Sequence, residues 1–412
     1  MLKTIRPLTL AVSMALLSAA AQAETVKFAF IDPLSGPFAP VGQNQLKSFQ
    51  TIAELANQQK WAGEHQMQVV GFDNKGSPQE SLTQLKAVID QGYRYIIQGN
   101  GSGVGLALLD AINKHNERNP GKEVVYLNYA AIDPDMTNSK CSFWHFRFDA
   151  NADMKMEALT SYMAPMKDIK SVYIIGQNYA MGQSVSRSAK EYLKRKRPDI
   201  KIAGDDLHPI AQVKDFSPYL AKIKASGADT VITANWGADL ALLIRAAKDA
   251  DLKANFYTYY AVTTGVPTAM GAAGAERVKT VGNWMVNGDV ASGKSIVEGF
   301  KKKYNDDFYT AQTHSSIGML AQAIKQSKST NPVKVAFALE GAKFTSLNGG
   351  VMMNKVDHQL QQPLYIGTWT KVDGKAVKYD QENTGYGWKM DKKIDAYYAT
   401  QPTSCQMKRP AM

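Results

Sequence analysis

The chain has 412 residues, of which 44% are hydrophobic and 21% charged, and its formal net charge is +11. This length and composition are those of an ordinary globular protein of about two domains, with enough apolar residues to bury a sizeable core. Beyond the N-terminus, no run of about 20 apolar residues occurs, which excludes a membrane-spanning helix.

The N-terminus has the pattern of a secretory signal peptide. Lys3 and Arg6 precede the apolar run 8–20, and the small residues Ala21 and Ala23 come directly before Glu24. We expect cleavage after Ala23, which lowers the net charge from +11 to +9 and places the mature protein outside the cytoplasm. Export argues against a nucleic-acid partner for this basic chain. We interpret the basic cluster 194–197 as the end of a helix, where cations interact favourably with the helix dipole.

The mature chain begins with a repeated strand–helix pattern. We expect a strand over 25–31, a Pro/Gly/Ser turn at 32–37, and then a helix with apolar residues at helical spacing. A second strand, 68–72, leads to a helix with Ser77 as its N-cap, and 123–128 forms a fourth strand. Four such units imply a parallel sheet covered by helices on both faces.

The third unit, residues 93–105, has a buried strand, a glycine-rich turn and a helix start in immediate succession. Successive glycines let the backbone pass close to a ligand, and the free N–H groups at the start of the helix 106–115 favour a carboxylate or phosphate. Ligands of open α/β sheets usually bind at this place, just outside the carboxyl end of a strand. The candidate anion-binding residues are Asn100, Gly101, Ser102 and Gly103.

The strand–helix pattern starts again after residue 148 and predicts a second β-α domain of similar size. No Gly/Ser or Pro linker separates the two halves, so we expect the chain to cross between two lobes in ordered strands that act as hinges. The segment 278–344 returns to strand-then-helix order, and 349–369 alternates like a closing β-ribbon. The expected elements are helices at 153–163, 183–196, 217–225, 238–250, 296–304 and 315–326, and strands at 171–175, 200–204, 229–234 and 256–259.

Motifs for catalysis, cofactors and metals are incomplete in this chain. The glycines at 99–103 do not continue into the third glycine of a dinucleotide fingerprint. A nucleophile elbow would need glycines two residues on either side of Ser102, where Asn100 and Val104 stand. The histidines are scattered, with no pair at ligand spacing. We therefore expect neither an enzyme nor a cofactor or metal site.

Cys141 and Cys405 are the only cysteines. An even count in an oxidising compartment favours a disulfide between them, which would tie the tail to the middle of the chain. Two buried thiols are the alternative.

Aromatic residues cluster at three strand ends where a cleft between the lobes would open. They are Tyr129, Trp236 and the stretch 257–260. Such side chains give flat walls for an apolar ligand, although half of them could simply belong to the core.

Five short segments carry a family resemblance over essentially the whole mature chain: 33–37, 99–105, 130–137, 214–216 and 238–252. In order and spacing they resemble the periplasmic substrate-binding proteins of branched-chain amino-acid-type ABC importers. The resemblance implies an α/β fold of two Rossmann-like lobes, with parallel sheets flanked by helices and a three-segment hinge. The implied lobes are 24–147 with about 283–352, and 148–282 with about 353–412.

The same resemblance implies a periplasmic, monomeric receptor that closes on a small solute and delivers it to a membrane permease. It assigns the ligand carboxylate to Ser102 and to the backbone beside Ala130. The family's tyrosine wall falls on Met181, with Tyr179 close by, while Trp236 keeps an aromatic at the other wall. A ligand-presenting subunit of a sensor system is a remote alternative.

Departures from the family pattern concern the amine of an amino-acid ligand. Ile132 stands where amino-acid-binding members have a Thr that contacts carboxylate and amine, and Tyr260 stands where a Glu pairs with the ammonium. The aromatic near the first turn becomes Val41. An enclosed ammonium without an acceptor is costly.

We therefore expect a carboxylate without an amine, aromatic or branched, held between Ser102 and a wall of Tyr129, Trp236 and Tyr260. A one-residue slip of the alignment would instead make Asp133 the ammonium acceptor. Branched-chain amino acids remain the alternative ligands.

Overall fold

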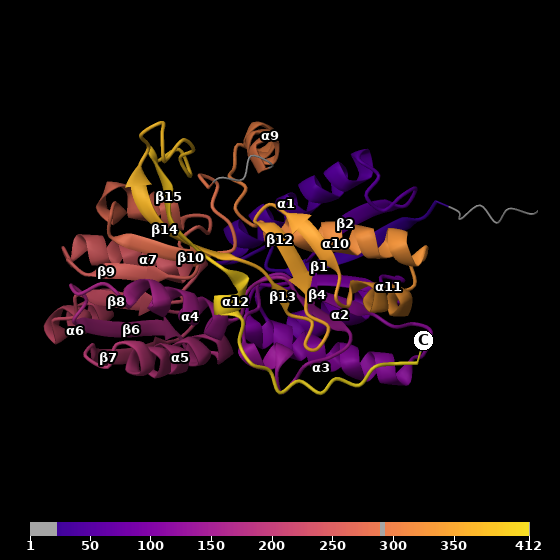
Figure 1. The fold of residues 1–412 in the computed structure, drawn as a ribbon, viewed down its shortest axis with the longest axis horizontal. Coiled ribbons are helices and arrows are strands. Elements are labelled where there is room, and N and C mark those ends of the chain that lie inside the picture. The colour runs from indigo at the N-terminus through magenta and orange to yellow at the C-terminus, as the bar shows by residue number, and fades with distance from the viewer. Residues whose placement is uncertain (1–22, 289–292, 412) are drawn as a thin grey trace, which may run out of the picture.

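The computed structural model describes residues 23–288 and 293–411, so the expected signal peptide lies outside the described residues except for Ala23. The chain forms two α/β lobes side by side (Figure 1). Each lobe has a mainly parallel sheet with helices on both faces, which confirms the expected fold class. No helix in the described ranges is long and apolar enough to cross a membrane.

The N-terminal lobe is built on a five-stranded parallel sheet in the order β2-β1-β3-β4-β5. A small antiparallel sheet, β11-β12-β13, extends it. Its strands are β1 (Thr25–Asp32), β2 (Gln66–Asp73), β3 (Tyr95–Gln98), β4 (Val125–Asn128), β5 (His145–Arg147), β11 (Lys343–Ser346), β12 (Gly349–Met353) and β13 (Leu360–Gln361). Its helices are α1 (Ala39–Gln58), α2 (Pro78–Asp90), α3 (Ser102–Arg118), α9 (Lys294–Tyr304), α10 (Gln312–Ser327) and α11 (Pro332–Leu339).

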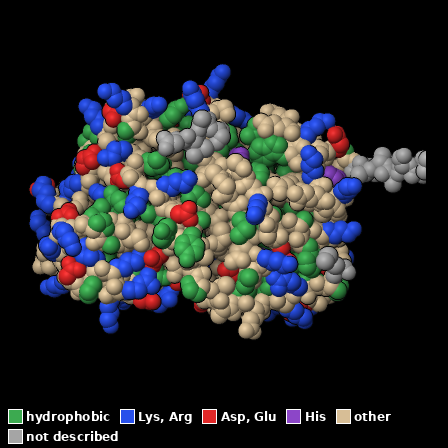
Figure 2. All heavy atoms as spheres, in the orientation of Figure 1, with side chains coloured by type: hydrophobic (Ala, Val, Ile, Leu, Met, Phe, Trp, Pro, Cys, Tyr) green, Lys and Arg blue, Asp and Glu red, His purple; other side chains and the backbone are tan. Residues whose placement is uncertain are grey.

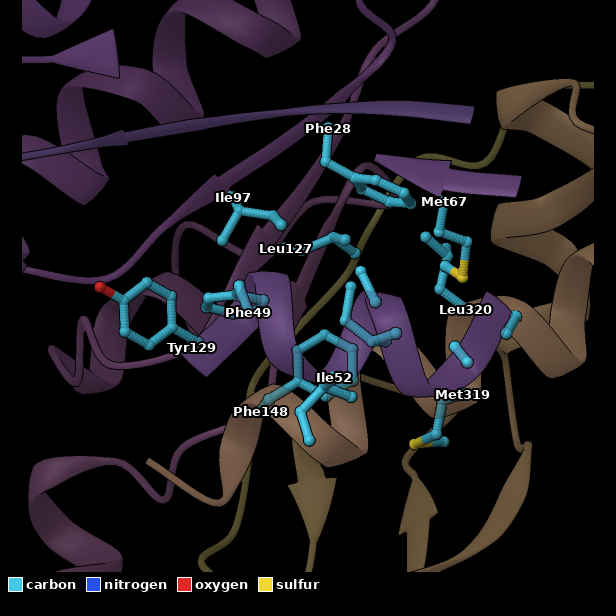
Figure 3. Packing of buried hydrophobic residues seen from close by; sticks show 14 of the residues in the cluster. Phe28, Phe49, Ile52, Met67, Ile97, Leu127, Tyr129, Phe148, Met319 and Leu320 are labelled. Atoms are coloured by element: carbon cyan, nitrogen blue, oxygen red, sulfur yellow. The ribbon is translucent and has the colours of Figure 1, made fainter. Parts of the chain in front are cut away.

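Alternate residues of the buried strands supply the two cores of this lobe. Phe28 and Phe30 of β1 pack toward α1 and α10, whereas Ala29 and Ile31 pack toward α2 and α3. Side chains of a strand point to opposite faces in turn, so a strand covered on both faces must be apolar throughout. Figure 3 shows the first core, in which Phe28, Ile97 and Leu127 of the sheet lie against Phe49 and Ile52 of α1.

The C-terminal lobe is built on a seven-stranded sheet in the order β15-β14-β10-β9-β8-β6-β7. Strands β6 to β10 are parallel, and β14 and β15 close the sheet as an antiparallel pair. Its strands are β6 (Ser171–Gln177), β7 (Lys201–His208), β8 (Thr230–Thr233), β9 (Asn255–Thr258), β10 (Val278–Gly282), β14 (Leu364–Lys371) and β15 (Tyr386–Ile394). Its helices are α4 (Ala152–Met163), α5 (Ala180–Lys196), α6 (Ser217–Ser226), α7 (Gly237–Asp249), α8 (Val266–Met270) and α12 (Ala396–Ala399).

The chain crosses between the lobes after β5, after β10 and after β13. The first and third crossings are hydrogen-bonded to each other, because Gln359 Nε2 donates to Asp149 O at 2.8 Å and Gln362 Nε2 donates to Phe148 O at 2.7 Å. From the sequence, the third crossing is placed near residue 352, several residues before the position at which the chain leaves the N-terminal lobe. Strands β12 and β13 still pack on the N-terminal lobe, where the side chains of Val351 and Leu360 join its core.

The tail leaves the C-terminal lobe, although all residues up to 412 are assigned to that lobe from the sequence. Helix α12 contacts α4 of that lobe, and the chain then runs along the N-terminal lobe (Figure 1). There Cys405 forms a disulfide with Cys141, and Arg409 Nε lies 2.8 Å from Glu340 Oε1. The disulfide is the one expected from the two cysteines, whereas the contact between Arg409 and Glu340 had no signal in the sequence.

Basic side chains are spread over both lobes and interspersed with acidic ones on the face shown in Figure 2. The basic cluster lies at the end of α5, as expected, and Arg195, Lys196 and Arg197 pair with acidic neighbours. Lys196 Nζ lies 2.6 Å from Glu157 Oε1, and Arg197 Nη2 lies 2.7 Å from Asp199 Oδ2. These pairs agree with a structural role for the cluster.

We expect the double variant Cys141→Ser/Cys405→Ser to unfold at a lower urea concentration than the wild type. The bond closes a loop of sequence separation 264, and losing such a restraint on the unfolded chain costs about 2–5 kcal/mol. Urea unfolding with and without a reductant measures the effect, and the reductant should leave the double variant unchanged. Equal midpoints for both proteins would contradict this expectation.

Candidate functional site

A cavity lies between the lobes where the carboxyl ends of their parallel strands face each other. Gly99 follows β3, Ala130 follows β4, Trp236 follows β8 and Tyr260 follows β9. Its free volume is about 30 Å³, enough for a few water molecules, so a larger solute needs more room than this cavity offers. The cavity is lined by Val41, Gln45, Gly99, Asn100, Gly101, Ser102, Ala130, Tyr179, Met181, Trp236, Tyr260 and Thr263.

The glycine-rich turn forms one wall of this cavity. Gly101 has a φ of +89° and is the N-cap of α3, so the helix begins at Ser102 rather than near residue 106. The first N–H groups of α3 have no intrahelical acceptor and favour an anion. Ser102 Oγ accepts a hydrogen bond from the Asp133 N–H at 3.2 Å. Within the described chain its own proton has no acceptor, so the hydroxyl can donate to a solute.

Glycine is required at position 99 for a steric reason. A Cβ atom there would lie 2.8 Å from the Ala130 nitrogen and 2.8 Å from the Tyr129 ring. The turn after β3 and the chain after β4 therefore approach each other closely at the cavity.

The carboxylate of Asp32 holds this turn in place from beneath. It accepts hydrogen bonds from Gly99 N and Asn100 N, both at 3.0 Å, and from Tyr129 Oη at 2.6 Å. Burial raises the pKa of Asp32 to about 7, although the hydrogen bonds from Tyr129, Asn100, Gly99 and Gln98 lower it. The cradle thus depends on a carboxyl group that is fully removed from water.

Two aromatic rings from different lobes meet at the opposite wall. The ring of Trp236 stacks on Phe38 of the N-terminal lobe, with centroids 3.9 Å apart, and its Nε1 donates to Tyr179 Oη at 3.1 Å. A Cβ atom at Gly237 would lie 2.9 Å from the Phe38 ring, which explains the glycine there. Phe38 therefore supplies an aromatic ring near the first turn, although the family resemblance puts Val41 at the aromatic position.

Tyr260 is the cavity residue with charged groups behind it. Its hydroxyl lies 3.3 Å from Asp149 Oδ2 and 3.4 Å from Ala130 O. Lys155 Nζ lies 3.0 Å from the same Asp149 oxygen and 4.5 Å from the centre of the Tyr260 ring. Burial, followed by the nearby Asp149, raises the pKa of Tyr260 well above its usual range, so the phenol stays neutral.

Three of the expected site residues do not line the cavity. Tyr129 is fully buried beneath the cradle, and Ile132 packs among apolar residues of the C-terminal lobe. Gly103 lies on α3 beside the lining residues. Asp133, the alternative ammonium acceptor, does not line the cavity either. Its Oδ1 accepts a hydrogen bond from Asp135 N at 2.9 Å. The remaining expected residues come together: Asn100, Gly101, Ser102, Ala130, Tyr179, Met181, Trp236 and Tyr260.

Sequence reasoning did not single out Gln45, Thr263, Phe38 or Asp32 as site residues. Gln45 could have been found, because it lies one helical turn after Val41 on α1 and shares its face. Asp32 directly follows the expected first strand, at the edge of the sheet where ligands bind. Thr263 and Phe38 lie in loops, and no local pattern marks them.

Comparison with known proteins gives consistent results. A model of the periplasmic binding protein family matches residues 25–376. Leu/Ile/Val-binding protein homolog 4 of Brucella melitensis is 32% identical over 403 residues, which cover 95% of each chain. The closed crystal structure of the leucine-, isoleucine-, valine-, threonine- and alanine-binding protein of Brucella ovis has a TM-score of 0.82 at 30% identity, covering 94% of this chain and 100% of that chain.

A more distant solved structure is similar in fold alone. It is a solute-binding protein of an ABC transporter from Rhodopseudomonas palustris HaA2, in complex with p-hydroxybenzoic acid. Its TM-score is 0.75 at 20% identity, and the match covers 90% of this chain and 97% of that chain.

We expect Asp32→Asn to lower the free energy of unfolding by about 1–3 kcal/mol in mildly acidic buffer, because the amide nitrogen would face backbone donors. The carboxyl pKa rises from 3.8 to about 7 on folding. Its protonation therefore stabilises the fold fully below the unfolded pKa, and this contribution is lost as the pH rises through about 7.

Urea unfolding of both proteins at several pH values tests this sign. The difference in stability between wild type and variant should shrink as the pH rises from about 4 to about 8. A difference that stays constant over this range would contradict the raised pKa of Asp32.

Proposed function

The chain belongs to the periplasmic binding protein family, and we propose that it is the receptor of an ABC importer that captures a small carboxylate-bearing solute between its lobes. Proteins of this family bind solutes in the periplasm and deliver them to a membrane permease. In our proposal, the signal peptide is cleaved after Ala23 and the mature receptor is a monomer.

The position of Ser102 is the observation that supports a carboxylate on the solute. Its hydroxyl lies at the N-terminus of α3 in the cavity wall, and its oxygen is already occupied by the Asp133 N–H. The free hydroxyl proton and the unpaired N–H groups of the first helical turn are all donors. A group with several acceptor oxygens and a negative charge suits them best.

The absence of charge in the cavity supports a solute without an amine. None of the described residues that line it is Asp, Glu, Lys or Arg. An ammonium group enclosed there would lose its hydration without gaining a counter-charge, and such burial is costly. The rings of Trp236 and Tyr179 and the side chain of Met181 suit an aromatic or branched apolar group at the other end of the solute.

Branched-chain or other small amino acids are the second candidate. The Brucella ovis relative at 30% identity is named as a leucine-, isoleucine-, valine-, threonine- and alanine-binding protein. An amino acid would need a charged partner for its ammonium, and Asp133, which does not line the cavity, would have to move toward it to provide one.

We expect Ser102→Ala to weaken binding of the preferred carboxylate by about 1–3 kcal/mol, because it removes a hydrogen bond to a charged group. Calorimetric titration of the ligand-stripped mature protein measures this change. Ser35→Ala is a matched control, since Ser35 is exposed and lies outside the cavity lining. Unchanged affinity in Ser102→Ala would remove Ser102 from the site.

The amine-free ligand class is tested by titration with matched pairs. We expect 4-methylpentanoate or 3-phenylpropanoate to bind with micromolar or tighter affinity, on the order of −8 kcal/mol, and leucine or phenylalanine to bind far more weakly. The physical reason is the missing counter-charge for the ammonium. Tight binding of the amino acids alone would favour the second candidate.

A further inference from the structure

The hydroxyl of Tyr260 lies in the cavity wall beside the chain that follows β4. It reaches across from the C-terminal lobe to within 3.4 Å of Ala130 O. Ala130 in turn lies beside the glycine-rich turn, because its nitrogen would be only 2.8 Å from a Cβ atom at Gly99. Tyr260 is therefore placed to contact the carbon next to a carboxylate bound at Ser102.

The proton of this hydroxyl is directed into the wall. Its two acceptors are Asp149 Oδ2 at 3.3 Å and Ala130 O at 3.4 Å. Whichever of them takes the proton, the lone pairs of the phenol oxygen are what Tyr260 offers to a solute. The raised pKa of Tyr260 keeps this proton in place near neutral pH. Tyr260 thus acts as an acceptor toward the cavity.

The charge behind Tyr260 is balanced. Asp149 is fully buried, and Lys155, whose side chain is 2% exposed, pairs with it at 3.0 Å. The same ammonium lies 4.5 Å from the centre of the Tyr260 ring. A solute ammonium at Tyr260 would therefore meet a neutral oxygen backed by a compensated ion pair, with another cation behind the ring. This arrangement suits a neutral donor better than a charged one.

The side-chain oxygens of Gln45 and Thr263 in the cavity wall are already engaged. Gln45 Oε1 accepts from Asn100 Nδ2 at 2.6 Å and lies 2.7 Å from Tyr129 Oη. Thr263 Oγ1 donates to the backbone oxygen of Tyr260 at 2.8 Å. The phenol oxygen of Tyr260, in contrast, accepts no hydrogen bond from any described residue, so it can accept one from a solute hydroxyl.

We propose that Tyr260 determines specificity and that the preferred solute is a 2-hydroxy carboxylate, whose hydroxyl donates to Tyr260 while its carboxylate binds at Ser102. This inference rests on the proposed carboxylate-binding function. A 2-oxo acid would place an oxygen against the lone pairs of Tyr260, and an unsubstituted acid would leave them unpaired. A 2-amino acid would bring a charge without a counter-charge.

Two matched series of four acids test the proposal on the ligand-stripped mature protein. One series is 4-methylpentanoate with its 2-hydroxy, 2-oxo and 2-amino (leucine) forms, and the other is 3-phenylpropanoate with the same three forms. In the series whose side chain fits, we expect the 2-hydroxy acid to bind most tightly, about 5- to 10-fold better than the unsubstituted acid. Calorimetric titration measures each affinity.

Tyr260→Phe keeps the ring beside Lys155 and removes only the oxygen. The preference of about 5- to 10-fold for the 2-hydroxy acid over the unsubstituted acid should disappear. Loss of the contact with Ala130 O changes both affinities by the same factor, so the ratio of the two is the readout. Tyr162→Phe is a matched control, because Tyr162 Oη also bonds an aspartate, Asp391 at 3.1 Å, outside the cavity lining. It should leave all affinities unchanged.

The results separate the two proposals. If the wild type binds acids with no preference for the hydroxyl, or if Tyr260→Phe weakens all acids alike, the role of Tyr260 is overturned and the carboxylate function stands. If only the amino acids bind, both the amine-free class and the role of Tyr260 are overturned. Binding of none of the acids would overturn the proposed carboxylate function, and this inference with it.

Discussion

One buried carboxylate, Asp32, fixes the end of the N-terminal lobe that faces the solute. It stands at the end of β1, and its hydrogen bonds reach the turn after β3 and the tyrosine after β4. Three adjacent strand ends are thereby joined through one group. The turn itself is rich in glycine and has little rigidity of its own, so the direction of its N–H groups, and of the Ser102 hydroxyl, depends on this buried contact.

The two walls of the cavity differ in chemistry. The N-terminal lobe supplies donors from α3, whereas the C-terminal lobe supplies rings and an uncharged acceptor. The two charges directly behind Tyr260 in this second wall, Asp149 and Lys155, pair with each other. In the proposed binding mode, a single charged group on the solute is recognised, at one end only, and the rest is selected by shape and by one hydrogen bond.

The fold could be predicted from local signals because each strand and helix carries its own pattern. Successive residues from Phe28 to Ile31 face the two cores in turn, and Ser77 caps α2 by accepting a hydrogen bond from Glu80 N. Most residues of the cavity wall were also expected, some because they follow a strand directly and others, such as Tyr179 and Met181, through the family resemblance. Phe38 and the start of α3 were missed, because each depends on contacts between distant segments: the stack on Trp236, and the hydrogen bonds by which Asp32 holds the turn before α3. The tail was assigned to the C-terminal lobe, although the disulfide that ties it to the middle of the chain was expected.

The path of the chain makes the two lobes unequal during biogenesis. The N-terminal lobe is assembled from separate stretches of sequence, and the C-terminal lobe is largely inserted between them. Cys141 precedes its partner by 264 positions in the chain, so this bond can form only after most of the polypeptide has been made. The covalent closure of the chain is thus a late event, which follows the synthesis of both lobes' central sheets.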